Sequence, residues 1–484
     1  MASNVKQELL RKLPSISDLL ATETVAAWLA EHPRGLVTEC LRVVVADLRR
    51  QILADEAGRC APRHVTEEFV LTLARQALDE RTQPHLRPAV NATGIILHTG
   101  LGRAVWPQSV VDSLARDLKG YVTLEVDRET GLRSARDRRI EYLLTELTGA
   151  EAATVVNNNA AATTLVLSAL AAEKEVVISR GQLIEIGGAF RLPDVMAQSR
   201  ARMVEVGTTN RTHLRDYEAA VTDQTAVILR VHPSNYRILG FTATPTLAEL
   251  VALAHSRSLI LVDDLGAGAL VALEQFGLPH EPTMGESIAA GADVVLASAD
   301  KLMGAGQGGV IVGRKEYIDR VRKHPLARAV RVDKTCLMAL ERTLMLFRDV
   351  ELLKKEHPTY RMLAAPLSEL RRRARSLAAA IRKAAPQAQV ELLDGVGFLG
   401  SGSLPMEQLP TRLVSVTVEG LEAADLARRL RMDQAAVFTR IEDGRVLMDV
   451  RTVQPHEIPQ IAAAVGRARP DKTGRDTQAP CSLE

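Results

Sequence analysis

Cysteine is scarce in this chain, and its few copies lie far apart. The 484 residues include four cysteines, and no two of them form a Cys-x-x-Cys pair. They are Cys40, Cys60, Cys336 and Cys481. This spacing argues against a zinc site and against a disulfide framework. We therefore expect a protein of the reducing cytoplasm.

The chain also lacks an excess of charge and long apolar runs. Lysine and arginine number 61 against 59 for aspartate and glutamate, which leaves a net charge of +2. Because the two charges are so nearly balanced, the net charge gives no global argument for or against binding nucleic acid, and any RNA site must be a local patch. The longest weakly polar run, residues 160–172, is shorter than the ~20 residues of a membrane span. Because residues 1–11 are polar and charged, we expect neither a signal peptide nor a membrane partner.

The pattern of helix and strand signals divides the chain into several parts. Hydrophobic residues make up 46% of the sequence, and the length suffices for two or three domains. We expect an N-terminal helical module over residues 1–65, a linker helix over 66–89, a large α/β domain over 90–335, a small α+β domain over 336–469 and a disordered tail over 470–484.

The central part has the signature of a parallel sheet flanked by helices. Short β-branched runs at 175–178, 226–229 and 259–262 alternate with helical patterns. Further on, residues 413–418 predict a strand, and Asp443-Gly444 predicts the turn of a hairpin. The predicted fold class is therefore α/β, with a small α+β domain at the C-terminal end.

Lys301 stands in a context that suits a cofactor-bearing lysine. It follows the apolar run 293–297 and the residues Ser-Ala-Asp, and a glycine-rich segment at 304–309 comes next. Many pyridoxal phosphate (PLP) enzymes present the lysine that forms a Schiff base with the cofactor in this way. A lone Ser-x-x-Lys also occurs on ordinary protein surfaces, so the neighbouring segments must decide.

Two aspartates directly follow the apolar run 259–262. A carboxylate at the end of a parallel strand reaches a ligand at that edge of the sheet. In a PLP enzyme it would keep the pyridinium nitrogen protonated, which makes the ring an electron sink. We favour Asp263 for this role, with Asp264 on the opposite face of the strand. A structural cap or turn is the alternative for such an aspartate.

Residues 157–162 read Asn-Asn-Asn-Ala-Ala-Ala and open a predicted helix. Free backbone amides at the positive end of a helix form a site for the cofactor phosphate, to which Asn158, Asn159 and Ala160 would contribute. An ordinary N-cap is the alternative. Ser298 is a second candidate for binding the phosphate.

Three arginines are candidates for an anion site. Arg103 ends the segment 91–103, which also contains His98, and Arg328 and Arg331 flank Ala-Val after the proposed cofactor region. Guanidinium groups stay charged and present fixed donor forks to an anion. Solvated surface arginines and a packed His98 are the alternatives.

Together these segments resemble bacterial selenocysteine synthase, the L-seryl-tRNA(Sec) selenium transferase family, along nearly the whole chain. The resemblance lies in residues 13–15, 91–103, 129–131, 157–162, 185–191, 207–210, 234–236, 263–266, 300–301, 324–326, 328, 331 and 443–445. It is more specific than a general PLP fold, because the motifs also keep their order.

The resemblance implies an aminotransferase-like fold of type I, with PLP as cofactor. It implies a homodimer as the catalytic unit, assembled into a decamer with active sites at subunit interfaces. Lys301 would be the Schiff-base lysine, Asp300 would assist proton transfer, and Asn235 would lie beside the cofactor. The arginines Arg103, Arg328 and Arg331 would bind selenophosphate. The N-terminal module would hold tRNA(Sec).

The implied reaction starts from serine esterified to tRNA(Sec). Loss of the α-proton and of the β-hydroxyl gives a dehydroalanyl intermediate, to which selenium from selenophosphate adds. Two positions depart notably from the family pattern: Gly100 replaces an asparagine and Gln182 a glutamate. The departures at residues 134–135, 299 and 305–306 exchange small or turn residues.

Two other functions remain open from the residues. A related PLP lyase or aminotransferase acting on a free amino acid or amino sugar acid would share the catalytic core but would not need the N-terminal module. A catalytically silent RNA-binding or assembly protein would not need the intact set of Asp263, Asp300 and Lys301.

Overall fold

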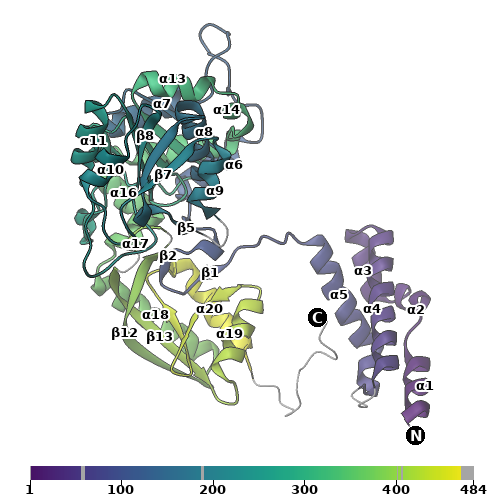
Figure 1. Ribbon diagram of the computed structural model, residues 1–484. Coiled ribbons are helices and arrows are strands. Elements are labelled where there is room, and N and C mark those ends of the chain that lie inside the picture. The colour runs from purple at the N-terminus through teal and green to yellow at the C-terminus, as the bar shows by residue number, and fades with distance from the viewer. Residues whose placement is uncertain (1, 56–59, 187–189, 401, 405–406, 470–484) are drawn as a thin grey trace. The chain divides into compact units, whose positions relative to one another are not determined.

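The computed structural model describes residues 2–55, 60–186, 190–400, 402–404 and 407–469, so the tail expected to be disordered, 470–484, lies outside it. The chain forms two compact units, one of residues up to Pro88 and one from Ala89 to Arg469 (Figure 1). Among the described residues, no helix combines the length and apolar character that a membrane crossing requires.

The first unit is a set of helices around a core rich in leucine and valine. Its elements are α1 (Ala2–Lys12), α2 (Ile16–Leu20), α3 (Glu23–Glu31), α4 (Arg34–Ala54), η1 (Pro62–Val65) and α5 (Glu67–Thr82). The hydroxyls of Ser15, Thr22 and Thr66 accept hydrogen bonds from amides in the first turns of α2, α3 and α5. Because α5 packs on α4 and buries Val70, the helix expected as a linker over 66–89 belongs to this core.

The second unit contains a seven-stranded sheet in the order β3-β11-β10-β9-β8-β4-β7. The strands are β3 (Ala152–Val156), β4 (Glu175–Ser179), β7 (Arg202–Val206), β8 (Thr225–Val231), β9 (Ile260–Gly266), β10 (Val294–Ser298) and β11 (Gly309–Gly313). All neighbours are parallel except β11, which runs antiparallel to β10 and β3. Strands buried on both faces read as continuous apolar runs, and this explains the β-branched segments of the sequence.

Helices cover both faces of this sheet (Figure 1). One core contains residues of α8 (Asn159–Ala171), α9 (Leu192–Gln198) and α13 (Lys315–Lys323). The other contains residues of α7 (Arg138–Thr148), α10 (Leu214–Ala220), α11 (Leu247–Ser256), α12 (Met284–Ala289) and α15 (Lys334–Leu346). Shorter or peripheral elements are η2 (Thr99–Leu101), α6 (Gln108–Asp117), η3 (Arg180–Gln182), β5 (Glu185–Ile186), β6 (Phe190–Arg191), η4 (Leu273–Phe276), α14 (Leu326–Ala329), α16 (Val350–Glu356) and α17 (Pro358–Ala364).

A five-stranded sheet, in the order β15-β16-β13-β12-β2, forms the C-terminal part. Its elements are β2 (Ile95–Leu97), β12 (Ala388–Gly400), β13 (Gln408–Val418), β15 (Arg440–Glu442) and β16 (Arg445–Asp449), with α18 (Leu367–Ala384), α19 (Ala423–Met432), η5 (Pro455–Glu457) and α20 (Ile458–Arg467). β1 (Val90–Asn91) pairs with β14 (Val437–Phe438). The predicted hairpin at residues 443–444 is present, with φ of 49° and 70° at its two turn residues.

The border between the two sheets differs from the expected border at residue 335. Leu337, Leu340 and Leu344 of α15 lie in the core of the large sheet, so helices beyond 335 still belong to it. Conversely, β1 and β2 pair with C-terminal strands. Strand pairing over such sequence distances leaves no local pattern, which is why the sequence did not predict it.

Candidate active site

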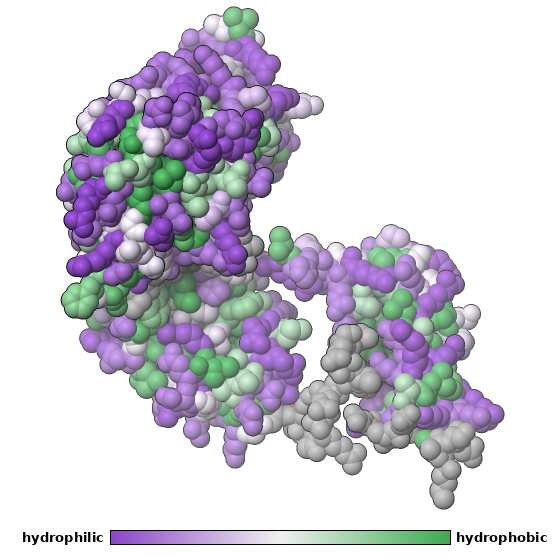
Figure 2. Space-filling model, in the orientation of Figure 1, coloured by the Kyte–Doolittle hydropathy of each residue, from purple (hydrophilic) through white to green (hydrophobic). Residues whose placement is uncertain are grey.

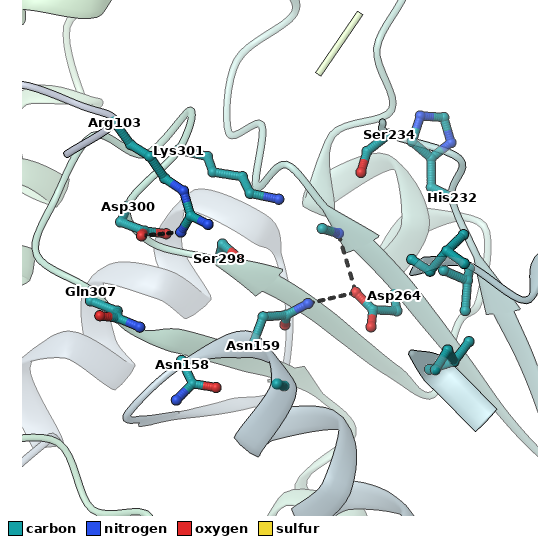
Figure 3. Close-up of a pocket in the computed structure, with 15 residues that line it drawn as sticks. Arg103, Asn158, Asn159, His232, Ser234, Asp264, Ser298, Asp300, Lys301 and Gln307 are labelled. Carbon is teal, nitrogen blue, oxygen red and sulfur yellow. Dashed lines mark hydrogen bonds and ion pairs between the residues drawn. The ribbon is translucent and has the colours of Figure 1, made fainter. Parts of the chain in front are cut away.

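A cavity of about 270 Å³ opens at the edge of the large sheet where β8, β9 and β10 end. Ligands of open α/β sheets bind at this carboxyl edge. Most of the predicted site residues line it, namely Arg103, Asn158, Asn159, Ala160, Ser298, Asp300 and Lys301 (Figure 3). The fold thus brings together segments that lie far apart in the sequence.

Lys301 follows β10 closely and places its amine in the cavity. The residue is 6% exposed. Burial, followed by the charge of Arg103, lowers the pKa of the Lys301 ammonium, while three nearby carboxylates act in the opposite direction. A Cβ at Gly402 would lie 2.5 Å from Nζ, so the backbone there approaches the amine closely. A buried amine of lowered pKa is suited to act as a nucleophile.

The two aspartates of β9 face opposite sides, in the reverse of the predicted assignment. Asp264 lines the cavity, and Asn159 Nδ2 and Thr163 Oγ1 donate hydrogen bonds to its carboxylate at 2.8 and 3.0 Å. Asp263 is 0% exposed and pairs with Arg230 Nη1 at 2.7 Å. The structure thus places Asp264, and not the predicted Asp263, at the cavity. Alternation along a strand predicts two faces, but it does not tell which of them faces the ligand.

The asparagine segment forms an N-cap and also borders the cavity. The side chain of Asn158 caps α8 by accepting a hydrogen bond from the amide of Ala161 at 2.9 Å. Its neighbour Asn159 holds Asp264 instead, and Asn159 Oδ1 is buried with no hydrogen-bond partner among the described residues. The first turn of α8 borders the cavity, so its positive end faces a ligand there.

Arg103 and Asp300 form an ion pair beside Lys301 (Figure 3). Arg103 Nη1 lies 2.6 Å from Asp300 Oδ2, and the arginine backbone adopts a φ of 63°. The arginine side chain keeps 30% exposure. It therefore retains N–H groups for an anion while it holds the neighbouring carboxylate.

Besides Asp263, three predicted site residues do not line the cavity of this chain. Arg328 is exposed on α14, and Arg331, also exposed, has its Nη1 3.4 Å from Glu125 Oε1. Asn235 turns its Nδ2 to the carbonyl of Glu185 at 3.2 Å. The predicted three-arginine site is therefore not assembled within one chain.

His232 and Ser234 also line the cavity and were missed by the sequence analysis. Both follow the end of β8, and they lie on the other side of Lys301 from Asp300 (Figure 3). Glu281 is 3% exposed, and its Oε1 lies 3.6 Å from His232 Nε2. The position after a strand was a signal for the first two residues. Glu281 lies in a segment without such a signal.

The two notable departures from the family pattern lie outside the cavity lining. Gln182 is 6% exposed, and its Oε1 accepts a hydrogen bond from the amide of Val231 at 3.0 Å. A Cβ at Gly100 would make an ordinary contact, 3.4 Å from the ring of His98. Gln182 thus serves as a structural acceptor.

These residues fit pyridoxal phosphate. Lys301 offers the amine, and the start of α8 offers amides for a phosphate. Asp264 offers a carboxylate for the ring nitrogen at the cavity wall, held in place by hydrogen bonds from Asn159 and Thr163. The fold and the cavity define a PLP-dependent enzyme of the aminotransferase-like class.

Comparison with known proteins gives the family. The family described as L-seryl-tRNA selenium transferase matches residues 89–454, and the one described as selenocysteine synthase N terminal matches residues 10–49. The chain belongs to the L-seryl-tRNA(Sec) selenium transferase family, which confirms the resemblance found in the sequence.

Relatives that carry this name match nearly the whole chain. One from Geobacter metallireducens is 46% identical over 458 residues, which cover 94% of this chain and 98% of the relative. One from Caldanaerobacter subterraneus is 45% identical over 447 residues, which cover 92% and 95%. The solved structure of D-glucosaminate-6-phosphate ammonia-lyase is similar in fold, with a TM-score of 0.54, 22% identity and coverage of 79% of this chain and 96% of that one.

Proposed function

We propose that this protein converts L-seryl-tRNA(Sec) into L-selenocysteinyl-tRNA(Sec), with selenophosphate as the selenium donor. The family match over residues 89–454 carries the proposal, because it coincides with a cavity in which Lys301, Asp300 and Arg103 stand together. The second match, over residues 10–49, lies in the helical unit that an enzyme of free amino acids would not need.

The chain's own groups take distinct roles in this reaction. When bound, PLP supplies the electron sink that stabilises negative charge on the substrate's α-carbon. Lys301 would hold the cofactor and, with its lowered pKa, accept the α-proton as a base. Asp264 would keep a proton on the ring nitrogen. The first turn of α8, through Asn158, Asn159 and Ala160, would hold the phosphate together with Ser298.

The other groups at the cavity handle protons and anions. Asp300 is adjacent to Lys301 and forms an ion pair with Arg103, so it would orient the amine and relay protons. The free N–H groups of Arg103 would bind selenophosphate. Arg328 and Arg331 would reach the same anion from another subunit, since both are exposed on this chain.

Assembly of several subunits agrees with the surface of the second unit. Tyr121, Leu239 and Phe241 are highly exposed although they are large and apolar. Figure 2 shows apolar patches within a largely hydrophilic surface. Such patches commonly mark contacts with other chains. We propose a homodimer as the catalytic unit and a decamer as the full assembly.

The helical unit is proposed to bind tRNA(Sec) in the cytoplasm. Exposed basic side chains stand on α1 and α4, among them Arg11, Lys12, Arg42 and Arg49. Such a local group can contact phosphates even though the whole chain has a net charge of only +2.

The test is single-turnover conversion of seryl-tRNA(Sec) with selenophosphate, with seryl-tRNA(Ser) and free serine as controls. We expect selenocysteinyl-tRNA from tRNA(Sec) alone. A PLP-loaded enzyme that ignored every charged tRNA but acted on a free amino acid or amino sugar acid would be a lyase instead. A purified protein that bound tRNA and no PLP would be a silent RNA-binding relative.

A further inference from the structure

Two buried side chains near the start of α17 hold the turn that carries Lys301. His357 Nε2 lies 3.1 Å from the carbonyl oxygen of Met303, and the Tyr360 hydroxyl donates a hydrogen bond to the carbonyl of Leu302 at 2.9 Å. Both rings are 0% exposed. The two carbonyls belong to the residues that directly follow Lys301, so these bonds fix the backbone next to the amine.

The histidine acts as a neutral donor. A carbonyl oxygen only accepts, so Nε2 must carry the hydrogen and Nδ1 must be the bare nitrogen. Burial lowers the pKa of His357 to about 4, which keeps the ring uncharged near neutral pH. Among the described residues, Nδ1 has no hydrogen-bond partner. The side chain therefore orients the turn without adding charge beside Lys301.

The two rings fit closely and have little freedom to move. Gly304 has a φ of 65°, and a Cβ there would lie 2.1 Å from the His357 ring, so the imidazole rests on the backbone of the turn. Phe347 meets the rings of His357 and Tyr360 edge-on, with centroids 5.9 and 5.6 Å apart. Packing of this kind fixes the directions of both hydrogen bonds.

The end of α17 is tied to the C-terminal sheet. Arg451, which is 3% exposed, donates hydrogen bonds from Nη1 to the carbonyl of Met362 and from Nη2 to that of Pro410, both at 2.6 Å. Pro410 lies in β13 and Met362 in α17. A continuous set of contacts therefore runs from the five-stranded sheet through α17 to the turn of Lys301.

We propose that His357 and Tyr360 are positioning residues for Lys301. Through them, α17 links the C-terminal sheet to the backbone turn that holds the Lys301 amine in place. The inference rests on the role of Lys301 proposed above. Neither ring lines the cavity, so both act through the backbone of residues 302 and 303.

The test compares full-length, PLP-loaded variants. Tyr360→Phe removes a single oxygen, His357→Leu removes the donor, and His357→Gln keeps one. Tyr217→Phe, at a 0% exposed tyrosine in α10, is the matched control. Three quantities are measured: the PLP dissociation constant, the midpoint pH of the bound cofactor's absorbance titration, and the melting temperature of the apoprotein.

Loss of one buried hydrogen bond should raise the PLP dissociation constant about 5- to 10-fold. The absorbance midpoint should also move in Tyr360→Phe and His357→Leu, with His357→Gln closer to the wild type. If these variants lowered only the melting temperature and left both cofactor measurements at the values of Tyr217→Phe, the residues would be merely structural. Should His357→Leu fail to fold, Tyr360→Phe alone decides.

A separate measurement distinguishes failure of the underlying assignment. Borohydride reduction of the wild-type enzyme, followed by peptide mass analysis, shows which lysine carries the cofactor. Cofactor on another lysine would overturn the role of Lys301. Cofactor on Lys301, together with variants that match the control, would overturn only the positioning role.

Discussion

The two sides of the proposed active site are built differently. On the cofactor side, partners contact one another within one chain: Asn159 binds Asp264, and Arg103 binds Asp300. On the anion side, Arg328 and Arg331 are exposed and lie outside the cavity. One chain therefore brings together most of the residues proposed to hold the cofactor but only one of the three expected arginines, and we propose that the anion site depends on assembly.

The strongest test of the cofactor side is Lys301→Ala. Without the amine, the site loses both its attachment point and its base, so single-turnover conversion should fall by about 10³-fold or more. The absorbance of the bound cofactor should change at the same time. Lys323→Ala, at an exposed lysine of α13, is the control and should keep both signals. Equal loss in the two variants would contradict the assignment.

The two neighbouring aspartates give the next largest contrast. Asp264→Asn should bind PLP yet slow the reaction by about 10²-fold, because an amide does not hold the ring nitrogen protonated. Asp263→Asn should instead lower the unfolding temperature, since it leaves Arg230 without its buried partner. Rates and thermal melts of both variants check this. A larger loss of rate in Asp263→Asn would restore the original assignment.

The anion side is tested by Arg328→Ala and Arg331→Ala. Each should raise the KM for selenophosphate about 10-fold while PLP absorbance stays unchanged, because a charge-assisted contact to the anion is lost and the groups proposed to hold the cofactor are intact. Arg322→Ala is a matched control, since this arginine of α13 is engaged with Glu141 inside the chain. It should leave that KM unaltered.

Mixed assemblies sharpen the same comparison. In an assembly made only of Lys301→Ala or only of Arg328→Ala, every active site lacks one of the two side chains. If arginine and lysine come from different subunits, mixing the two variants after dissociation should restore some intact sites, and activity should exceed that of either parent. A mixture no more active than the sum of its parents would place both residues in one chain.

Local signals in the sequence predicted many of the residues that line the cavity, but they could not tell which side chain of a strand faces it. The position of Lys301 after a strand and the asparagines before a helix are features of short segments, and the structure brings both to the cavity. The choice between Asp263 and Asp264 required the direction of β9 within the sheet. The pairing of β2 with β12 joins residues about three hundred positions apart, for which no short pattern exists.

The groups that support the site were the hardest to predict. Glu281 and His357 stand in irregular segments and touch their partners only through the tertiary fold. Neither residue type is unusual, and no spacing marks them. Their significance lies in burial, which the sequence does not reveal: both are nearly or fully shielded from solvent.

The smallest expected effect concerns stability in acid, and it again separates a buried group from an exposed one. Burial lowers the pKa of His357 to about 4, whereas an unfolded chain binds this proton near its ordinary value of ~6.5. The unfolded state therefore binds more protons between these values, and stability is lost as pH falls from about 6.5 to 4. Between pH 7.5 and 5 the loss should be about 2 kcal/mol.

Urea unfolding of the apoprotein at the two pH values measures this loss, and His357→Gln should remove it. The control is His280→Gln, at an exposed histidine whose pKa is raised by its hydrogen bond with Glu274. A raised pKa acts with the opposite sign, so this variant should keep the acid sensitivity or slightly increase it. If His357→Gln were as acid-sensitive as the wild type, His357 would not be held neutral in the folded protein, and its place as a fixed donor to the Lys301 turn would be lost.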